Sequence, residues 1–225
     1  MKRLCLLVVI LALAAMLMAA DTVAVLSASK GKVNLERNKQ DLKFKKGELL
    51  QDQDILRTKA ESFAAYKFID ASSMIKLFSN SVVTISATAQ SGKLAKKVSV
   101  DRGSVLASVK SGTGAFTVHT PTTVASVKGT EFMTRVDAEG ISMFTVTDGE
   151  VEIQIKSTGE ILSASKGKTA IISPKGEHVV RDSSPEDINA IEQAELEANQ
   201  TTAPSTIRIP VKDEAGNTKY IEITY

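Results

Sequence analysis

Residues 150–155 are Glu150-Val151-Glu152-Ile153-Gln154-Ile155, an unbroken alternation of polar and apolar side chains. A period of two places one set of side chains on each face of a β-strand, so this stretch predicts a strand with one buried face. The same pattern occurs in shorter segments at 32–36, 74–77 and 97–100. No helical periodicity of useful length interrupts the region from 22 to 182.

Glycines separate the alternating segments in the second half of this region. They include positions 103, 112, 129, 140, 149, 159, 167 and 176, which are mostly 8 to 11 residues apart. Short strands with turns at that interval indicate an all-β architecture rather than an α/β one. The heptapeptide at 26–32 also recurs letter for letter at 162–168. Recurring turn-strand units favour a twisted, β-solenoid-like stack of short strands, with an antiparallel sandwich as the alternative.

The pattern changes near residue 183. Ser184 before Pro185, followed by acidic residues, predicts a short α-helix to about Asn199. Two alternating segments within 207–225 predict a C-terminal β-hairpin. A lone hairpin is marginal in water, so it either docks on the body or pairs with a partner. We expect the domains to be a signal peptide (1–20), an all-β domain (21–182), a helix and linker (183–206) and a hairpin (207–225).

The N-terminus is typical of a secretory signal peptide. Lys2 and Arg3 precede an apolar run from 4 to 20. We therefore expect an exported protein, periplasmic or extracellular, with N-terminal anchoring in the inner membrane as the alternative. Cys5 lies within the run, so the mature chain would have neither a thiol nor a disulfide.

Composition excludes several classes of function. Removing residues 1–20 lowers Lys+Arg from 28 to 26 and leaves Asp+Glu at 26, so the mature chain is neutral. A neutral chain does not gather phosphates, and we expect no nucleic-acid partner. His119 and His178 have no carboxylate or thiol cluster beside them, and Asp52, Asp54 and Asp70 lack calcium-loop spacing. We expect no catalytic residue, metal or cofactor, and no enzyme.

Three segments of the β region carry motifs in a recognisable order. They are Phe116-Thr117-Val118-His119-Thr120-Pro121, Ala125-Ser126-Val127-Lys128-Gly129-Thr130-Glu131-Phe132 and Thr145-Val146-Thr147-Asp148-Gly149-Glu150-Val151. In order and spacing they resemble the FecR protein domain family, whose pattern is V-x-T-P, A-x-V-[RK]-G-T-E-F and V-x-x-G-x-V. The resemblance covers about residues 22–182. It departs at Asp70-Ala71-Ser72, where the family usually has Asp-Gly-Ser, so this turn is expected to differ in shape.

The resemblance implies an all-β, solenoid-like fold in the cell envelope. The best understood members are inner-membrane regulators of iron uptake, with an anti-sigma domain in the cytoplasm and a receptor-contacting part in the periplasm. Only three residues precede the apolar run of this chain. We therefore expect a free-standing exported FecR domain without direct sigma-factor contact.

The candidate site residues belong to the family motif. The preferred interpretation is that they have a structural role, and contact with a partner is the alternative. They are Thr120, Pro121, Lys128, Gly129, Thr130, Glu131, Phe132 and Gly149. Gly129 is expected to supply a special backbone conformation at a strand entrance, and Phe132 to fill the core. Glu131 would either contact a partner or accept backbone N–H bonds in a turn.

These features predict a non-catalytic envelope binding or scaffold module that acts on an envelope protein or glycan through its sheet faces or edges. The alternatives are a periplasmic carrier of a lipid or glycan, a periplasmic sensory module that contacts an outer-membrane receptor, and a hydrolase with dispersed carboxylates. Four lysines alternate with Leu42 and Phe44, namely Lys39, Lys43, Lys45 and Lys46. They predict a solvated strand face, and the weaker alternative is contact with anionic glycan or lipid headgroups.

Overall fold

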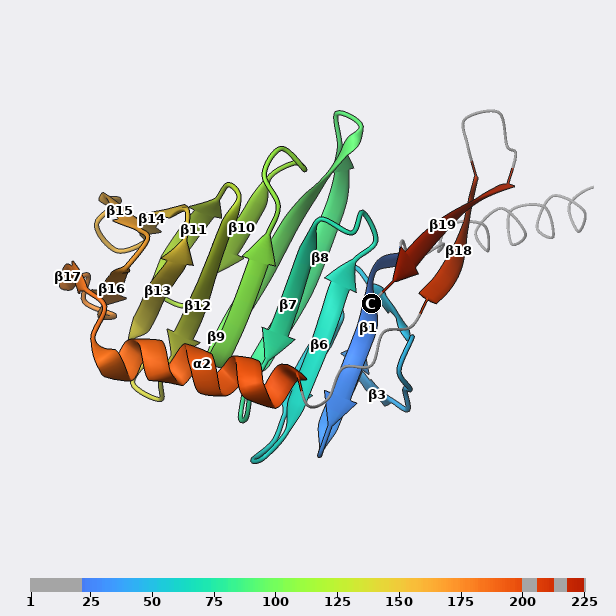
Figure 1. The fold of residues 1–225 in the computed structure, drawn as a ribbon, viewed down its shortest axis with the longest axis horizontal. Helices are drawn as coiled ribbons and strands as arrows, with labels where there is room; N and C mark the ends of the chain where they lie inside the picture. The colour runs from blue at the N-terminus through green and yellow to red at the C-terminus, as the bar shows by residue number, and fades with distance from the viewer. Residues whose placement is uncertain (1–21, 200–205, 213–217, 225) are drawn as a thin grey trace, which may run out of the picture.

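A computed structural model describes residues 22–199, 206–212 and 218–224. The predicted signal peptide and most of the linker after the helix lie outside these residues. The body consists of short strands with turns between them, as the alternation predicts (Figure 1). The strands are β1 (Thr22–Lys30), β2 (Val33–Arg37), β3 (Gln40–Leu42), β4 (Leu49–Gln51), β5 (Ile55–Thr58), β6 (Phe63–Phe68), β7 (Ser73–Leu77), β8 (Val82–Gln90), β9 (Lys93–Val109), β10 (Phe116–His119), β11 (Thr123–Val127), β12 (Thr130–Val136), β13 (Ser142–Asp148), β14 (Glu150–Ile155), β15 (Ile161–Ser165), β16 (Lys168–Ile172) and β17 (His178–Asp182).

The strands form two facing layers that share one strand. Sheet A has the order β4-β1-β6-β7-β9-β12-β13-β16-β17, and every pair in it is antiparallel. Sheet B has the order β3-β2-β5-β8-β9-β10-β11-β14-β15, and its β9–β10 pair is parallel. The 17-residue β9 passes between the layers, because its first part pairs with β8 and β10 and its last part with β7 and β12.

The chain winds from one layer to the other and back, mostly in pairs of strands, which confirms the solenoid-like stack. The repeated heptapeptide marks two of these crossings. Residues 26–32 end β1 in sheet A and lead to β2 in sheet B, whereas 162–168 end β15 in sheet B and lead to β16 in sheet A. The repeat therefore encodes a strand end followed by a turn between layers.

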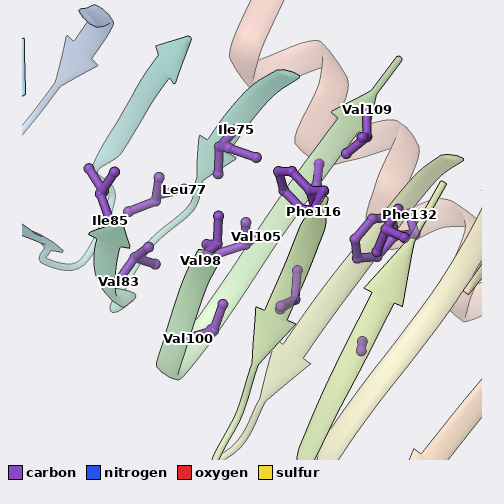
Figure 2. Packing of buried hydrophobic residues seen from close by; sticks show 14 of the residues in the cluster. Ile75, Leu77, Val83, Ile85, Val98, Val100, Val105, Val109, Phe116 and Phe132 are labelled. Carbon is purple, nitrogen blue, oxygen red and sulfur yellow. The ribbon is translucent and has the colours of Figure 1, made fainter. Parts of the chain in front are cut away.

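The main core lies between the two sheets and consists mostly of aliphatic side chains (Figure 2). Ile75 and Leu77 of sheet A face Val83, Ile85 and Val98 of sheet B, and all five are fully buried. Each such side chain contributes about 1.5–3 kcal/mol by burial. With no Trp in the chain, the bulk comes from a few rings, of which Tyr66, Phe68 and Phe116 form a row of edge-to-face contacts.

The predicted helix is α2 (Pro185–Asn199), and it crosses the outer face of sheet A (Figure 1). Its apolar face buries Ile191, Ala194 and Ala198 against the sheet, where Leu106 and Met133 belong to the same cluster. Ser184 and Asp187 cap its N-terminus reciprocally, because Asp187 Oδ2 accepts the Ser184 N–H at 2.8 Å and Ser184 Oγ accepts the Asp187 N–H at 3.3 Å.

The predicted hairpin consists of β18 (Thr206–Lys212) and β19 (Thr218–Thr224). It docks on the body, since Ile209 and Ile223 are buried against Val25 of β1. Two apolar surfaces outside the main core are therefore covered by the tail, one by α2 and one by the hairpin.

One local expectation requires correction. Lys43, Lys45 and Lys46 lie in a loop rather than on a strand, because β3 ends at Leu42 and Phe44 turns in to pack against the core. All three lysines are exposed. At Ala71, where the family usually has glycine, φ is +53°, in the left-handed region that favours glycine, and whether this turn differs in shape from the family's stays a prediction.

Candidate functional site

Three of the loops between strands meet at one edge of the stack. They follow β9, β11 and β13, and they carry Ser111, Gly129 and Gly149. A hollow of about 480 Å³ opens there, and we call it the motif hollow. Its lining residues are Ser108, Val109, Lys110, Ser111, Gly129, Thr130, Glu131 and Asp148. The structure thus brings part of the family motif together with Lys110 and Ser111.

Gly129 and Gly149 let these loops approach each other closely. Their φ angles are +65° and +80°, in the left-handed region that favours glycine. A Cβ atom at Gly149 would lie 2.6 Å from the carbonyl oxygen of Gly129, and one at Gly129 would lie 2.5 Å from Ser111 Oγ. Both positions therefore require glycine if the three loops are to approach one another this closely.

The next three motif residues differ in exposure. Thr130 is buried, and its hydroxyl donates to the carbonyl of Glu150 at 2.9 Å. The Thr147 hydroxyl lies 3.0 Å from the carbonyl oxygen of Glu131 and 3.2 Å from its carboxylate, and Glu131 remains half-buried at the hollow. This bond to the carboxylate comes from a side chain, whereas the structural alternative predicted backbone N–H donors. Phe132 is fully buried in the core. Of the three, Glu131 is placed to meet another molecule.

Charges of both signs surround the motif hollow. Lys128 is exposed beside it and lines a second hollow of about 280 Å³ with Glu150 and Glu152 on the face of sheet B. On sheet A, burial lowers the pKa of Lys67, and repulsion by Lys110 lowers the pKa further. This edge therefore carries basic side chains, Lys110 and Lys128, close to the acidic side chains of Glu131 and Asp148.

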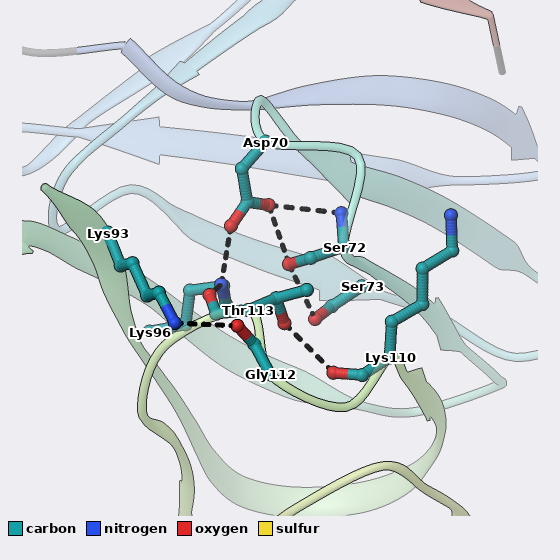
Figure 3. Close-up of polar contacts among 8 residues, drawn as sticks. All are labelled: Asp70, Ser72, Ser73, Lys93, Lys96, Lys110, Gly112 and Thr113. Atoms are coloured by element: carbon teal, nitrogen blue, oxygen red, sulfur yellow. Dashed lines mark hydrogen bonds and ion pairs between the residues drawn. The ribbon is translucent and has the colours of Figure 1, made fainter.

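A buried ion pair joins the two sheets beside this edge (Figure 3). Lys96 of sheet B is fully buried, and its ammonium lies 2.5 Å from Asp70 Oδ2 in the β6–β7 turn of sheet A. The same ammonium donates to the carbonyl of Thr113 at 2.9 Å, and the other oxygen of Asp70 accepts the Ser72 hydroxyl at 2.6 Å. The pair thus connects the 110–115 loop to sheet A and positions the residues that line the motif hollow.

Thr120 and Pro121 lie at the opposite edge, in the turn between β10 and β11. The Thr120 hydroxyl is 2.8 Å from that of Thr123 and accepts a bond of 2.8 Å from Ser142, while Pro121 is exposed. The structure therefore separates these two residues from the motif hollow, and gives Thr120 a buried network that fixes the turn.

The remaining polar candidates serve separate parts of the fold. Asp52 accepts the Ala87 N–H at 3.0 Å, and buried Asp54 pairs with Arg37 at 2.7 Å. His119 lies on sheet B, where burial and the charges of Lys156 and Lys97 lower its pKa, whereas His178 on sheet A lies 3.5 Å from Glu160. Within the described residues, no three side chains of the metal-binding types come together.

Sequence reasoning missed Lys96 and the residues contributed by the 110–115 loop. A signal for Lys96 exists, because it has the same strand phase as Val98 and Val100, which are both buried. Lys110 and Ser111 carry no such signal, since only the winding of the stack brings that loop beside Gly129.

Comparison with known proteins supports the family resemblance and describes the fold. No curated protein matches the sequence. Two crystal structures from Parabacteroides distasonis ATCC 8503, both described as candidate anti-sigma factors, are similar in fold. One, at 2.50 Å resolution, has a TM-score of 0.52 and 15% identity over 62% of this chain and 64% of its own. The other, at 1.65 Å, has a TM-score of 0.51 and 12% identity over 72% and 70%.

The chain thus spans just under two thirds of the first of these proteins. No helix among the described residues is long and apolar enough to cross a membrane. The family model described as FecR protein matches residues 54–152, a range that contains the motif hollow and the Lys96–Asp70 pair. Residues 54–152 of this chain therefore match the FecR protein family model, in agreement with the resemblance of the motifs.

Proposed function

We propose that this chain is a regulatory binding module of the bacterial envelope that binds a partner protein at the motif hollow and catalyses no reaction. The match of residues 54–152 to the FecR family model supports a regulatory or sensory role. The fold similarity to two candidate anti-sigma factors points in the same direction.

The observation that carries the proposal is the convergence of Gly129, Thr130 and Glu131 with Lys110 and Ser111 around one open hollow. Exposed charged side chains of both signs flank the hollow, Lys110 on one side and Asp148 on the other. Protein interfaces have such polar, mixed-charge rims, and complementary charges select the partner. Because the Lys96–Asp70 pair holds the 110–115 loop and the glycines let the other two loops pack closely, a partner would meet a surface that is already formed.

The proposal places this contact outside the cytoplasm, because the N-terminal sequence is typical of a secretory signal peptide. The partner is then an envelope protein, and an outer-membrane receptor fits the sensory variant of the proposal. The expectation that the chain makes no direct contact with a sigma factor remains a prediction.

Charge reversal at the motif hollow tests the proposal. Full-length chain carrying Lys110→Glu and Lys128→Glu would be expressed in the native host beside wild type and isolated after mild cross-linking. Lys175→Glu, in the exposed β16–β17 turn at the opposite edge, is the matched control. We expect a specific envelope protein with wild type and the control, and at least a tenfold loss with the double reversal. Equal recovery with all three proteins would contradict the proposal.

A second candidate function, a carrier of a small amphiphile, is favoured by one observation. A neighbouring hollow of about 580 Å³ has mainly apolar walls that include Phe116 and Val127, with Lys93 and Lys128 also lining it. An anionic lipid would place its chain on the apolar wall and its headgroup by the lysines. Native mass spectrometry of the protein purified from its host tests this: a bound lipid lost in Lys128→Glu supports the carrier, and unliganded protein contradicts it.

A further inference from the structure

The two ends of the β stack differ in how their edge strands are protected. At the β1 end the edge strands β3 and β4 have three residues each. The loop between them pairs with β1, because Gly47 donates to the carbonyl of Leu26 at 2.8 Å and Leu26 donates to that of Glu48 at 2.9 Å. Exposed lysines occupy the same loop. Short, covered and charged edges of this kind resist pairing with another chain.

The opposite end, formed by β15 and β17, has longer edge strands of five residues each (Figure 1). On β17, Val179 is 47% exposed and Val180 is 38% exposed. Val180 pairs with Ala170, which is buried in the main core, so Val180 is on the core-facing side of sheet A. The apolar interior is therefore partly open at this end.

The backbone of β17 also offers unpaired groups at this edge. The backbone N–H of Ser173 donates to the carbonyl of Glu177, and the backbone N–H of Ser183 donates to the carbonyl of Gly167. These two bonds fix the register of the β16–β17 ladder. Hydrogen-bonded and non-hydrogen-bonded residue pairs alternate along an antiparallel ladder. The backbone N–H and C=O groups of Val179 and Arg181 therefore face β16. Those of His178, Val180 and Asp182 point away from it, and no described strand pairs with β17 on that side. The carbonyl of Asp182 accepts a bond of 2.8 Å from Arg181 Nη1, while the groups of Val180 face outward at the centre of the strand.

We propose that a second copy of this chain pairs antiparallel with β17 around a two-fold axis at Val180. In this register Val180 lies opposite its own copy, and His178 lies opposite Asp182 on both sides of the axis. All three residues then turn their outward backbone groups toward the second copy, as a bonded antiparallel ladder requires. The Asp182 carbonyl has a second lone pair with which to accept a bond beside that from Arg181. Val180 then meets its own apolar copy, and the His178 imidazole can donate a hydrogen bond to the exposed Asp182 carboxylate, which also pairs with Lys168. The sequence of β17 is thus complementary to itself, which is why a second copy is the occupant that fits.

This surface is separate from the motif hollow. β17 is the last strand of sheet A, whereas the hollow lies at the ends of β9, β11 and β13. A pair of chains would therefore present two motif hollows, and would join two A sheets into one continuous sheet.

The first experiment removes the outward N–H of Val180. Val180→Pro deletes no bond to β16, so the fold is expected to remain while pairing is lost. Val180→Lys places like charges on the axis and is expected to have the same effect. The control is Ile161→Lys, which replaces an exposed apolar residue on the neighbouring β15. The readout is sedimentation equilibrium of the protein exported by its own leader, with circular dichroism to verify folding.

We expect wild type and Ile161→Lys to approach twice the mass of one chain as concentration rises, and both Val180 variants to stay at the mass of one chain. Wild-type protein that remains monomeric throughout the series would overturn the proposal. A dimer that persists in a folded Val180 variant would do so as well.

Cross-linking gives a second, independent readout. In a Cys5→Ser background, Val180→Cys provides the only thiol. Bonded antiparallel pairs have Cα atoms about 5.5 Å apart, within the range of a disulfide. We expect rapid formation of a disulfide dimer from Val180→Cys. Val179→Cys, which would lie opposite Arg181, should cross-link at least tenfold more slowly. Equal rates for the two variants would contradict the register.

Discussion

Ala71 carries a backbone conformation that suits glycine better. Its φ is +53°, and a left-handed alanine costs about 1–2 kcal/mol, whereas glycine costs about 0.5–1 kcal/mol through its greater freedom in the unfolded chain. We predict that Ala71→Gly raises the free energy of unfolding by about 0.5–1 kcal/mol. Urea denaturation measures this. Ala89→Gly, on exposed β8, is the control and should lower stability by a similar amount.

Tyr66 buries a hydroxyl without a hydrogen-bond partner among the described residues. Burial also raises the pKa of this phenol well above its ordinary value. Because an unsatisfied buried polar group destabilises the fold, we predict that Tyr66→Phe raises the free energy of unfolding by about 1 kcal/mol. Chemical denaturation would show this, with Tyr220→Phe at a 65% exposed position as a control that changes nothing. A less stable Tyr66→Phe variant would reveal a partner for the hydroxyl.

At the scale of elements, the Lys96–Asp70 pair joins a strand of one sheet to a turn of the other. Its partners differ in exposure, since the Lys96 side chain is fully buried and that of Asp70 is 27% exposed. We predict that Asp70→Asn costs about 3 kcal/mol, because it leaves a buried ammonium without its carboxylate. Lys96→Met should cost much less, since water can reach Asp70.

Thermal and urea unfolding of both single variants and of the double variant measure this asymmetry. The double variant should recover most of the stability that Asp70→Asn loses. If Lys96→Met were instead the more damaging change, the buried ammonium would not be the charge that requires compensation.

The cap of α2 is the second element with a measurable contribution. Burial opposes ionisation of Asp187, but hydrogen bonds from Arg181 at 2.7 Å and the Ser184 N–H at 2.8 Å outweigh it and lower the pKa of this carboxyl. We predict that Asp187→Ala lowers the free energy of unfolding by about 2 kcal/mol, from the lost cap and the lost charged bonds. Hydrogen exchange of 185–199 would show where the effect lies. Glu192→Ala, on the exposed side of α2, is the control.

The same carboxyl predicts a pH dependence. Because its pKa is lower in the folded protein than in the unfolded chain, its contribution is complete above the unfolded pKa. The contribution is lost as pH falls through the folded pKa. Stability curves of wild type and Asp187→Asn should therefore be separated at neutral pH and converge in acid. A constant separation at every pH would show that the charge of Asp187 does not stabilise the helix.

At the scale of the whole molecule, local patterns predicted the elements but not how they associate. Alternation and glycine spacing predicted the strands, and the Ser184 cap predicted α2, because both depend on neighbouring residues. The passage of β9 between sheets and the docking of the hairpin on Val25 depend on contacts far apart in sequence. The same limit applies to the site, where Gly129 and Glu131 were found from the motif and Lys110 was not.

The central claim is that a partner protein contacts the edge where the family motif converges. Its most direct test is a photo-cross-linking amino acid at Ser111, which lines the motif hollow, compared with the same group at Glu139, exposed in the β12–β13 turn at the opposite edge. In living cells of the native host, the account predicts one discrete adduct with an envelope protein from position 111 and none from 139. Equal adducts from both positions, or none from Ser111, would contradict it.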